Sequence, residues 1–303
     1  MEYALRTDGI TKIYGKHTVV DHVSMHVKKG DIYGFIGKNG AGKTTFMRVV
    51  AGLAAPAAGT MELFGSGDLE KQRQRLGTLI EQPGLYGTMT ARDNLEVVRK
   101  SFGITGKHAV EEMLEFVGLA QAGKKKVKNF SMGMKQRLGI AIALFRSPDF
   151  LILDEPINGL DPEGIKEVRD LLSKLNRERQ ITILISSHIL GELSKIASNY
   201  GIIKEGVLIE EFAAEDLKSR CRRCVKLVVD DVQRASTILE EKCHITEYDV
   251  PKEGVLRVFD GIDNSWVINR ELVEVGIHLK ESYLAGQDLE GYFMDLLGGA
   301  SNV

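Results

Sequence analysis

A short apolar strand, a glycine-rich loop and a helix follow one another near the start of the chain, and this order constrains the fold more than any other feature. The run Ile32–Ile36 has the length and composition of a buried strand. The loop Gly37–Thr44 reads GKNGAGKT, and its glycines let the backbone bring N–H groups close to phosphate oxygens. The helix expected through Thr45 to Val50 adds the positive end of its dipole. This order predicts a phosphate-binding loop in an α/β fold with a parallel sheet.

The side chains of this loop predict a nucleotide rather than a free phosphate. Lys43 is expected to neutralise the β- and γ-phosphate oxygens, and the Thr44 hydroxyl is expected to bind Mg²⁺. Because all eight residues of the loop fit a phosphate-binding motif and follow directly after a predicted strand, a chance glycine-rich turn is a poor alternative. The loop residues predicted to contact the nucleotide are Gly37, Asn39, Gly40, Ala41, Gly42, Lys43, Thr44 and Thr45.

Two further apolar runs, at 150–153 and 181–185, have the length of strands in a sheet covered on both faces. Asp154 ends the first run, where a carboxylate can hold Mg²⁺ through its water shell. Glu155, one residue on, is the predicted general base that polarises the attacking water. His188 follows the second run and is expected to reach the γ-phosphate while it holds the water and Glu155 in register.

From about Pro83 to Phe145 the apolar spacing becomes helical, which predicts a helical insertion with helices at 94–102, 109–117 and 133–144. The segment Phe130–Arg137, FSMGMKQR, leads into the last of these helices. The lysine-rich stretch at 124–128 is interpreted as a solvated loop, because no aromatic residues interleave with the lysines. A further helix is expected to begin at Asp161–Pro162 and to run to about Asn176.

These motifs, in this order, resemble those of the ATP-binding subunit of ABC transporters over residues 1 to about 215. The resemblance implies an α/β P-loop NTPase fold, the ABC nucleotide-binding domain with antiparallel β and helical subdomains, and the cofactors ATP and Mg²⁺. The helical subdomain would span about 83–145. The matching positions are Lys43 and Thr44 of Walker A, Asp154 and Glu155 of Walker B, Ser131 to Gln136 of the ABC signature, Asp161 of the D-loop, the switch histidine His188, and Tyr14, which matches the aromatic residue that stacks on adenine.

The resemblance also implies partners. In this family the signature contacts ATP held by the other subunit, so two copies of the chain would bury two ATP molecules head to tail in a symmetric dimer. The second implied partner is an integral membrane permease, which would hold the chain on the cytoplasmic face of the cell membrane. No nucleic-acid partner is expected. The signature residues expected to contact ATP in trans are Ser131, Met132, Gly133 and Gln136.

One position departs from the family pattern. The glutamine of the family's Q-loop falls where this chain has Glu81, and Gln82 follows directly, so either residue can serve at this position. A glutamine offers a neutral carbonyl and a donor amide, whereas an ionised glutamate is negative and only accepts hydrogen bonds. Glu81 is expected to join Thr44 and Asp154 as a ligand of Mg²⁺ and to pass the state of the nucleotide to the permease.

Three segments narrow the resemblance. The stretches 130–138, 154–161 and 187–193 resemble those of bacitracin-resistance and lantibiotic-immunity ATPases, which work with separate permeases to clear antimicrobial peptides from the cell's own membrane. The resemblance implies that the chain powers export of an antimicrobial peptide or another drug. The alternative is a soluble ABC ATPase that acts on a non-transport partner such as the ribosome. A single ATPase cassette and a net charge of −2 give that alternative no support.

Residues 216–303 predict a separate, small α+β domain. Strands are expected at 225–229, 255–259 and 277–283 and helices at 235–242 and 266–275, in an overall βαββαβ order that suits a ferredoxin-like domain. A terminal amphipathic helix is expected at 288–297. Because no ligand-binding constellation is visible here, a packing or dimerisation role is favoured over a ligand-binding regulatory one.

Composition and cysteines set the remaining limits. The 303 residues are enough for about two domains, and neither a signal peptide nor an apolar stretch approaching ~20 residues is visible. Three cysteines fit a reducing cytosol. Cys221 and Cys224 form a Cys-x-x-Cys pair followed by Cys243 and His244. Ordinary reduced thiols are favoured over a zinc site, because a second Cys-x-x-Cys or a spaced histidine pair is missing.

Overall fold

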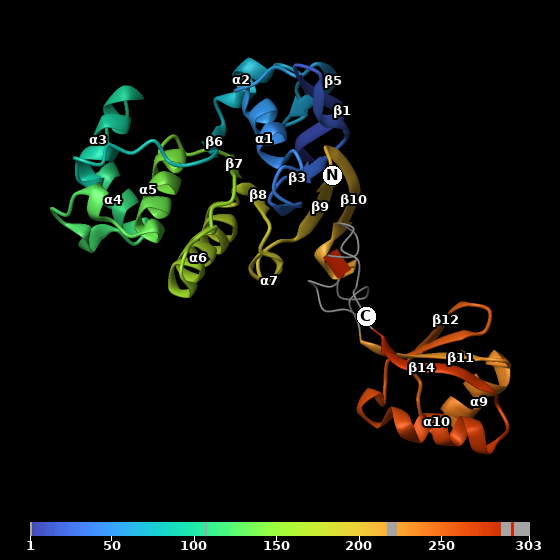
Figure 1. Cartoon of the computed structure of the whole chain (residues 1–303). Coiled ribbons are helices and arrows are strands. Elements are labelled where there is room, and N and C mark those ends of the chain that lie inside the picture. Colours follow the sequence, from blue (N-terminus) through green and yellow to red (C-terminus); the bar gives the residue numbers. More distant parts are fainter. Residues whose placement is uncertain (1, 107, 217–222, 286–291, 294–303) are drawn as a thin grey trace. The chain divides into compact units, whose positions relative to one another are not determined.

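The chain divides into two compact units, Met1–Ala214 and Glu215–Val303. A computed structural model describes residues 2–106, 108–216, 223–285 and 292–293 (Figure 1). Unit 1 contains two sheets and a group of helices, and unit 2 contains a third sheet and helices of its own.

A six-stranded sheet forms the centre of unit 1. Its strand order is β10-β9-β4-β8-β7-β6, and all neighbours are parallel except the edge strand β10. The continuous apolar runs are buried along their whole length, as expected for strands covered on both faces. The bounds are β4 (Ile32–Ile36), β6 (Leu76–Leu79), β7 (Phe150–Leu153), β8 (Thr182–Ser187), β9 (Asn199–Lys204) and β10 (Val207–Ala213).

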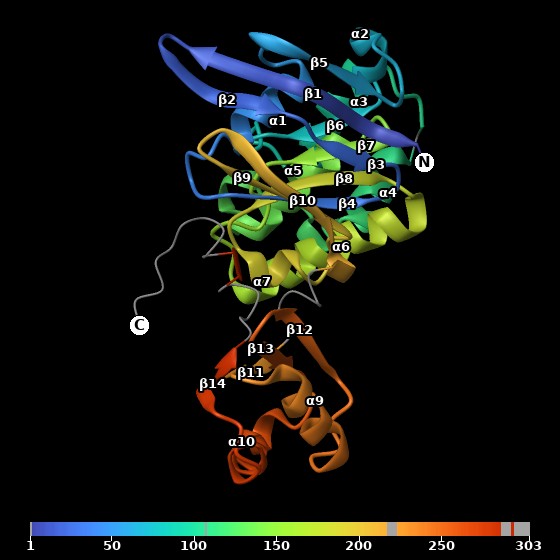
Figure 2. The same ribbon diagram turned by 90° about the vertical axis from the view of Figure 1, so that its right-hand side faces the viewer.

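An antiparallel sheet lies over one face of the first helix, α1 (Lys43–Ala51). Its strands are β1 (Tyr3–Tyr14), β2 (His17–Val23), β3 (His26–Lys28) and β5 (Ala58–Leu63), and β1 pairs with the other three. One hydrophobic core joins Leu5 and Val23 of this sheet to Phe46 of α1 and Phe35 of β4. The helix α1 therefore lies between the two sheets, as Figure 2 shows.

The helical part of unit 1 contains α3 (Ala91–Ser101), α4 (Ala109–Phe116) and α5 (Met132–Leu144). The helix α3 begins three residues before the predicted start, because the side chain of Thr90 accepts from the Asp93 N–H and Asp93 reciprocates in a capping box. Unit 1 also contains α2 (Leu69–Arg73), α6 (Pro162–Arg179) and α7 (Leu190–Leu193).

Two predicted boundaries near the nucleotide site are wrong. The helix α6 begins as expected, with Asp161 as its N-cap and proline in its first turn, but it continues to Arg179, where Gln180 ends it in a left-handed conformation. The strand β8 continues through two serines to Ser187 rather than ending at Ile185. Both serines are fully buried within the strand, and one of them matters at the site described below.

Unit 2 has a four-stranded antiparallel sheet in the order β12-β13-β11-β14. With the elements in chain order βαββαβ, each helix leads to a strand on the far side of a neighbour, which is the split βαβ arrangement of a ferredoxin-like domain. The elements are β11 (Cys224–Val229), α9 (Val232–Glu241), β12 (Tyr248–Lys252), β13 (Val255–Val258), α10 (Ser265–Glu274) and β14 (Leu279–Ala285).

The last predicted helix and the cysteine pair fall partly outside the described residues. Of the stretch 288–297 only Tyr292 and Phe293 are described, and both are helical. Cys221 lies outside the described residues. Cys224 is buried, which raises the pKa of its thiol, and Cys243 is half-buried. Among the described residues no group of three His, Cys, Asp or Glu side chains is arranged to hold a metal ion.

Candidate nucleotide site

The glycine-rich loop connects β4 to α1, and two of its glycines are required by close backbone approaches. A Cβ at Gly37 would lie 2.5 Å from the carbonyl oxygen of Ile203, and one at Gly42 would lie 2.6 Å from that of Val19. Gly42 also has φ of 106° and is the N-cap of α1, with no side chain capping the helix. The N–H groups of the first turn of α1 are therefore open toward the loop, as an anion site at a helix N-terminus requires.

A cavity of about 190 Å³ lies in the curve of this loop. The predicted contact residues Asn39, Gly40, Ala41, Gly42, Lys43, Thr44 and Thr45 all line it, together with Val19 and Glu155. Gly37 supports the loop from behind instead, because its carbonyl oxygen accepts a hydrogen bond from Lys43 Nζ at 2.6 Å. The glycines and the buried Lys43 ammonium among these residues suit a polyphosphate chain.

The buried ammonium of Lys43 has three partners. It donates to the carbonyl oxygens of Gly37 at 2.6 Å and Lys38 at 3.2 Å, and it lies 3.3 Å from Glu155 Oε1. Only 5% of the Lys43 side chain is exposed, so its charge is compensated by these groups rather than by water.

Asp154 and Thr44 are brought together as the sequence predicts. Thr44 Oγ1 donates to Asp154 Oδ2 at 2.6 Å, and the other carboxylate oxygen accepts from Ser186 Oγ at 2.6 Å. The Ser186 hydroxyl also accepts from the Glu155 N–H at 2.8 Å, so this one serine orients both acidic residues. The sequence interpretation assigned no role to Ser186. A signal was available, because Ser186 follows an apolar run just as Asp154 does. The carboxyl ends of parallel strands lie at the same edge of a sheet, so the two side chains could have been expected to meet.

Glu155 and His188 also meet. His188 Nδ1 lies 2.7 Å from Glu155 Oε2, and the other carboxylate oxygen, Oε1, is buried without a hydrogen-bond partner beside Lys43. Glu155 has a left-handed backbone with φ of 48°, a conformation that costs a non-glycine residue energy and turns its side chain toward the loop. The chain thus directs one carboxylate oxygen to a histidine and the other to the lysine of the loop.

The ABC signature does not meet the loop of its own chain. Ser131 is the exposed N-cap of α5 and accepts from the Met134 N–H at 3.2 Å, while Met132 beside it is 52% exposed. None of the residues lining the loop cavity comes from α5. Gly133 instead packs against α6, because a Cβ added at Gly133 would lie 3.5 Å from the Cα of Gly164. The signature therefore presents an exposed helix start on a surface separate from the loop cavity.

Tyr14 and Asp161 occupy positions at the edges of this site. Tyr14 ends β1 with 45% of its surface exposed, and the Lys12 ammonium lies 4.9 Å from its ring centre. The exposed ring can stack on a planar group if Lys12 moves aside, although Tyr14 does not line the loop cavity. Asp161 accepts from the Gly164 N–H at 3.1 Å as the cap of α6, and it does not line the loop cavity.

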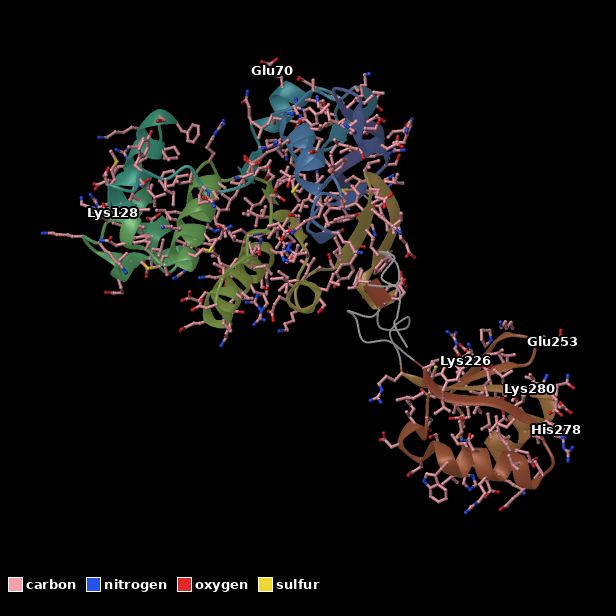
Figure 3. All side chains as sticks on the ribbon, in the orientation of Figure 1. Glu70, Lys128, Lys226, Glu253, His278 and Lys280 are labelled. Atoms are coloured by element: carbon pink, nitrogen blue, oxygen red, sulfur yellow. The ribbon has the colours of Figure 1, made fainter. Side chains whose placement is uncertain are left out.

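Glu81 and Gln82 have different surroundings. Glu81 forms an ion pair with Arg48 of α1 and does not line the loop cavity that includes Thr44, so its place among the Mg²⁺ ligands stays a prediction. Gln82 instead lines a cavity of about 420 Å³ that also includes Met132, Lys135 and Gln136 of α5. Lys128, labelled on the helical part in Figure 3, borders the same cavity.

The donors near Thr44 fit Mg²⁺. The hydroxyl of Thr44 and the carboxylate of Asp154 are oxygen donors side by side at the first turn of α1, and this ion takes oxygen ligands and keeps several of its waters. Because both Asp154 oxygens already accept hydroxyl hydrogen bonds, Asp154 would act through such waters. The fold and the site together define a P-loop domain that binds and hydrolyses a nucleoside triphosphate.

Comparisons with known proteins agree. Residues 20–158 match the ABC transporter family. The chain is 44% identical to the bacitracin transport ATP-binding protein BcrA of Bacillus licheniformis over 99% of both chains. It is 44% identical to the lantibiotic transport ATP-binding protein SrtF of Streptococcus pyogenes over 68% of this chain and 90% of that one. A dimeric bacterial ABC transporter cassette is 25% identical, with a TM-score of 0.61, over 69% of this chain and 98% of that one.

The chain belongs to the family of ABC transporter ATP-binding proteins. The predicted family and fold class are confirmed, and ATP binding and ATPase activity follow from the family. In the described part of the chain, every helix is too short or too polar to span a membrane.

Proposed function

We propose that this chain hydrolyses ATP to power a separate membrane permease that exports an antimicrobial peptide. The observation that carries the proposal is the similarity to a bacitracin transport ATP-binding protein, which extends over 99% of both chains and so includes unit 2. The similarity to a lantibiotic transport ATP-binding protein supports the same class of substrate. An ATPase acting on the ribosome is the less favoured function, because these relatives are transport proteins.

The active form in this proposal is a dimer of two copies. Each chain has one phosphate-binding loop and one signature, and Ser131 is exposed away from the loop cavity of its own chain. The signature residues Ser131, Met132, Gly133 and Gln136 would reach ATP on the second copy. The dimeric form of the related cassette supports this arrangement. ATP then favours the closed dimer, and hydrolysis removes that preference.

The chemistry follows from the contacts of each side chain. Lys43 would exchange its carbonyl partners for the β- and γ-phosphate oxygens, while the open N–H groups of the loop bind the remaining oxygens. Glu155 would accept a proton from the attacking water at Oε1, which has no hydrogen-bond partner and is freed from its ion pair with Lys43 when that ammonium turns to the phosphates. His188 holds the other oxygen, so that Glu155 is oriented toward the γ-phosphate.

Dependence on Mg²⁺ is part of the proposal. The ion, when bound, supplies positive charge that neutralises phosphate oxygens. Thr44 would bind it directly and Asp154 would hold its waters, because their oxygens are adjacent and oriented by Ser186. Glu81 becomes a third ligand only if it leaves Arg48.

The permease would hold the chain on the inner face of the cell membrane and would contact it near Glu81 and the helical part. To test the function, the chain is expressed in a sensitive bacterium together with a membrane permease that co-purifies with it. The inhibitory concentrations of bacitracin and of a lantibiotic are measured against a Glu155→Gln control. Resistance that requires Glu155 supports the proposal. Unchanged sensitivity with an active ATPase refutes peptide export, and co-sedimentation with ribosomes would support the alternative.

A further inference from the structure

The Glu81 carboxylate is held by a cation on α1. Its partner, Arg48, lies four residues after Thr44, so the two residues share one face of the helix and are about 6 Å apart along its axis. Thr44 is the residue whose hydroxyl meets Asp154. Glu81 is thus bound one helical turn beyond the predicted metal position, on the same face of the same helix.

The ion pair can be broken easily. Arg48 is 36% and Glu81 58% exposed, and a solvated pair of this kind contributes little to an equilibrium. A glutamine at position 81 could not form it, because a neutral amide carries no net charge. Because Glu81 is charged, Arg48 and a metal ion can both attract its carboxylate, whereas a glutamine would not be held by Arg48 in this way.

Glu81 also stands at a turn of the chain. Two residues earlier, the Leu79 carbonyl accepts from the Asp154 N–H at 2.8 Å, which fixes the end of β6 beside β7. Glu81 itself has φ of 67°, in the left-handed region that non-glycine residues adopt at a cost. The next residue, Gln82, borders the cavity lined by Met132 and Gln136. A rotation at Glu81 therefore moves Gln82 against the helix that carries the signature.

We propose that Arg48 is a positioning residue that competes with Mg²⁺ for the Glu81 carboxylate. Binding of the metal–nucleotide complex at Thr44 draws Glu81 away from Arg48, and the release shifts Gln82 against α5. The ion pair thus couples nucleotide binding at the loop of a chain to the position of the signature of that same chain, which serves the ATP of the second copy. This inference rests on the proposed binding of ATP and Mg²⁺ at the loop.

The test is a binding measurement on the full chain with a fluorescent ATP analogue, made in Mg²⁺ and again in EDTA. Loss of the Arg48 charge changes nucleotide affinity in both buffers, so the ratio of the Kd in EDTA to the Kd in Mg²⁺ isolates the part of the effect that depends on the metal. Arg48→Gln should raise this ratio about two- to five-fold, the range an exposed ion pair contributes. In a Glu81→Gln background the same substitution should leave the ratio unchanged.

Arg92→Gln is the matched control, because Arg92 forms a similarly exposed ion pair with Glu111 in the helical part. It should leave the ratio at the wild-type value. Hydrogen exchange gives a second readout: Mg²⁺ and nucleotide should raise exchange at 82–86 in the wild type, and Arg48→Gln should raise it without them.

Several results would overturn the role of Arg48. They are an unchanged or lowered ratio in Arg48→Gln, an equal rise in the Glu81→Gln background, or an equal rise in Arg92→Gln. A wild-type chain that does not bind the nucleotide at all would refute the proposed function instead. The two failures are therefore distinguishable in one experiment.

Discussion

The substitution Ser186→Ala tests how the acidic residues of the site are oriented. The Ser186 hydroxyl is fully buried, donates to Asp154 Oδ1 at 2.6 Å and accepts from the Glu155 N–H at 2.8 Å. Removing it takes away a hydrogen bond to a carboxylate, worth about 1.5–3 kcal/mol, and leaves a backbone N–H without its partner. We expect the free energy of unfolding of unit 1 to fall by about 2–4 kcal/mol.

The neighbouring serine provides the control. Ser187 is equally buried, but its hydroxyl makes only local bonds to the backbone of Ile189. Ser187→Ala loses only these neutral bonds and should cost about 1–2 kcal/mol, less than the loss of a bond to a buried carboxylate. Unfolding is followed by far-ultraviolet circular dichroism, because the single tryptophan, Trp266, lies in unit 2 and does not report on unit 1.

The ATPase rate separates orientation from stability. With Glu155 less well fixed, Ser186→Ala should lower kcat by at least about tenfold, equivalent to 1.4 kcal/mol of lost transition-state stabilisation. Ser187→Ala should retain kcat within about twofold under conditions in which both variants are folded. Equal losses of stability and of kcat in the two variants would refute the role given to Ser186.

Three other substitutions test separate parts of the account. Glu155→Gln should bind ATP and form a stable dimer in size-exclusion chromatography while turnover falls by about 10²–10⁴-fold, and wild-type turnover would show that Glu155 is not the base. Gly37→Ala should lose about 1–3 kcal/mol of stability and bind ATP more weakly, because its Cβ would lie 2.5 Å from the Ile203 carbonyl, whereas Gly67→Ala, with open space around it, should match the wild type in denaturant titrations. Burial and the neighbouring charge of Glu211 raise the pKa of Tyr33 well above its ordinary value. Because the unfolded chain then loses this proton first, stability should fall as pH rises above about 10, and Tyr33→Phe should make that fall shallower by up to about 1.4 kcal/mol per pH unit; an unchanged slope in pH-dependent unfolding would contradict this.

The central strands and the loop were readable from the sequence because local signals and tertiary structure agree there. The apolar runs at Ile32–Ile36 and Phe150–Leu153 have the same bounds in the structure, since both faces of each strand are buried. The start of α3 was also readable in principle, from the capping box of Thr90 and Asp93, although the helical spacing alone placed it too late.

The remaining features depend on contacts between distant residues. The ion pair of Arg48 and Glu81 joins residues 33 apart in sequence, and the bridge of Ser186 to Asp154 joins residues 32 apart. Neither pair leaves a local pattern. The edge strand β12 contains a proline and charged residues, which weaken the strand signal and are tolerated only at an edge. The strand β14 begins at Leu279, two residues after the predicted start, because Ile277 packs into the core of unit 2 before the strand.

The central claim, that the signature of one copy completes the site of the other, is tested by mixing two inactive variants. Lys43→Ala lacks a working loop, and Ser131→Arg lacks a working signature. In a mixed dimer, one site combines the intact loop of one chain with the intact signature of the other. If the copies associate at random, the equimolar mixture should recover up to about a quarter of the wild-type sites. A mixture as inactive as the separate variants, although both still bind to wild-type chains, would contradict the claim.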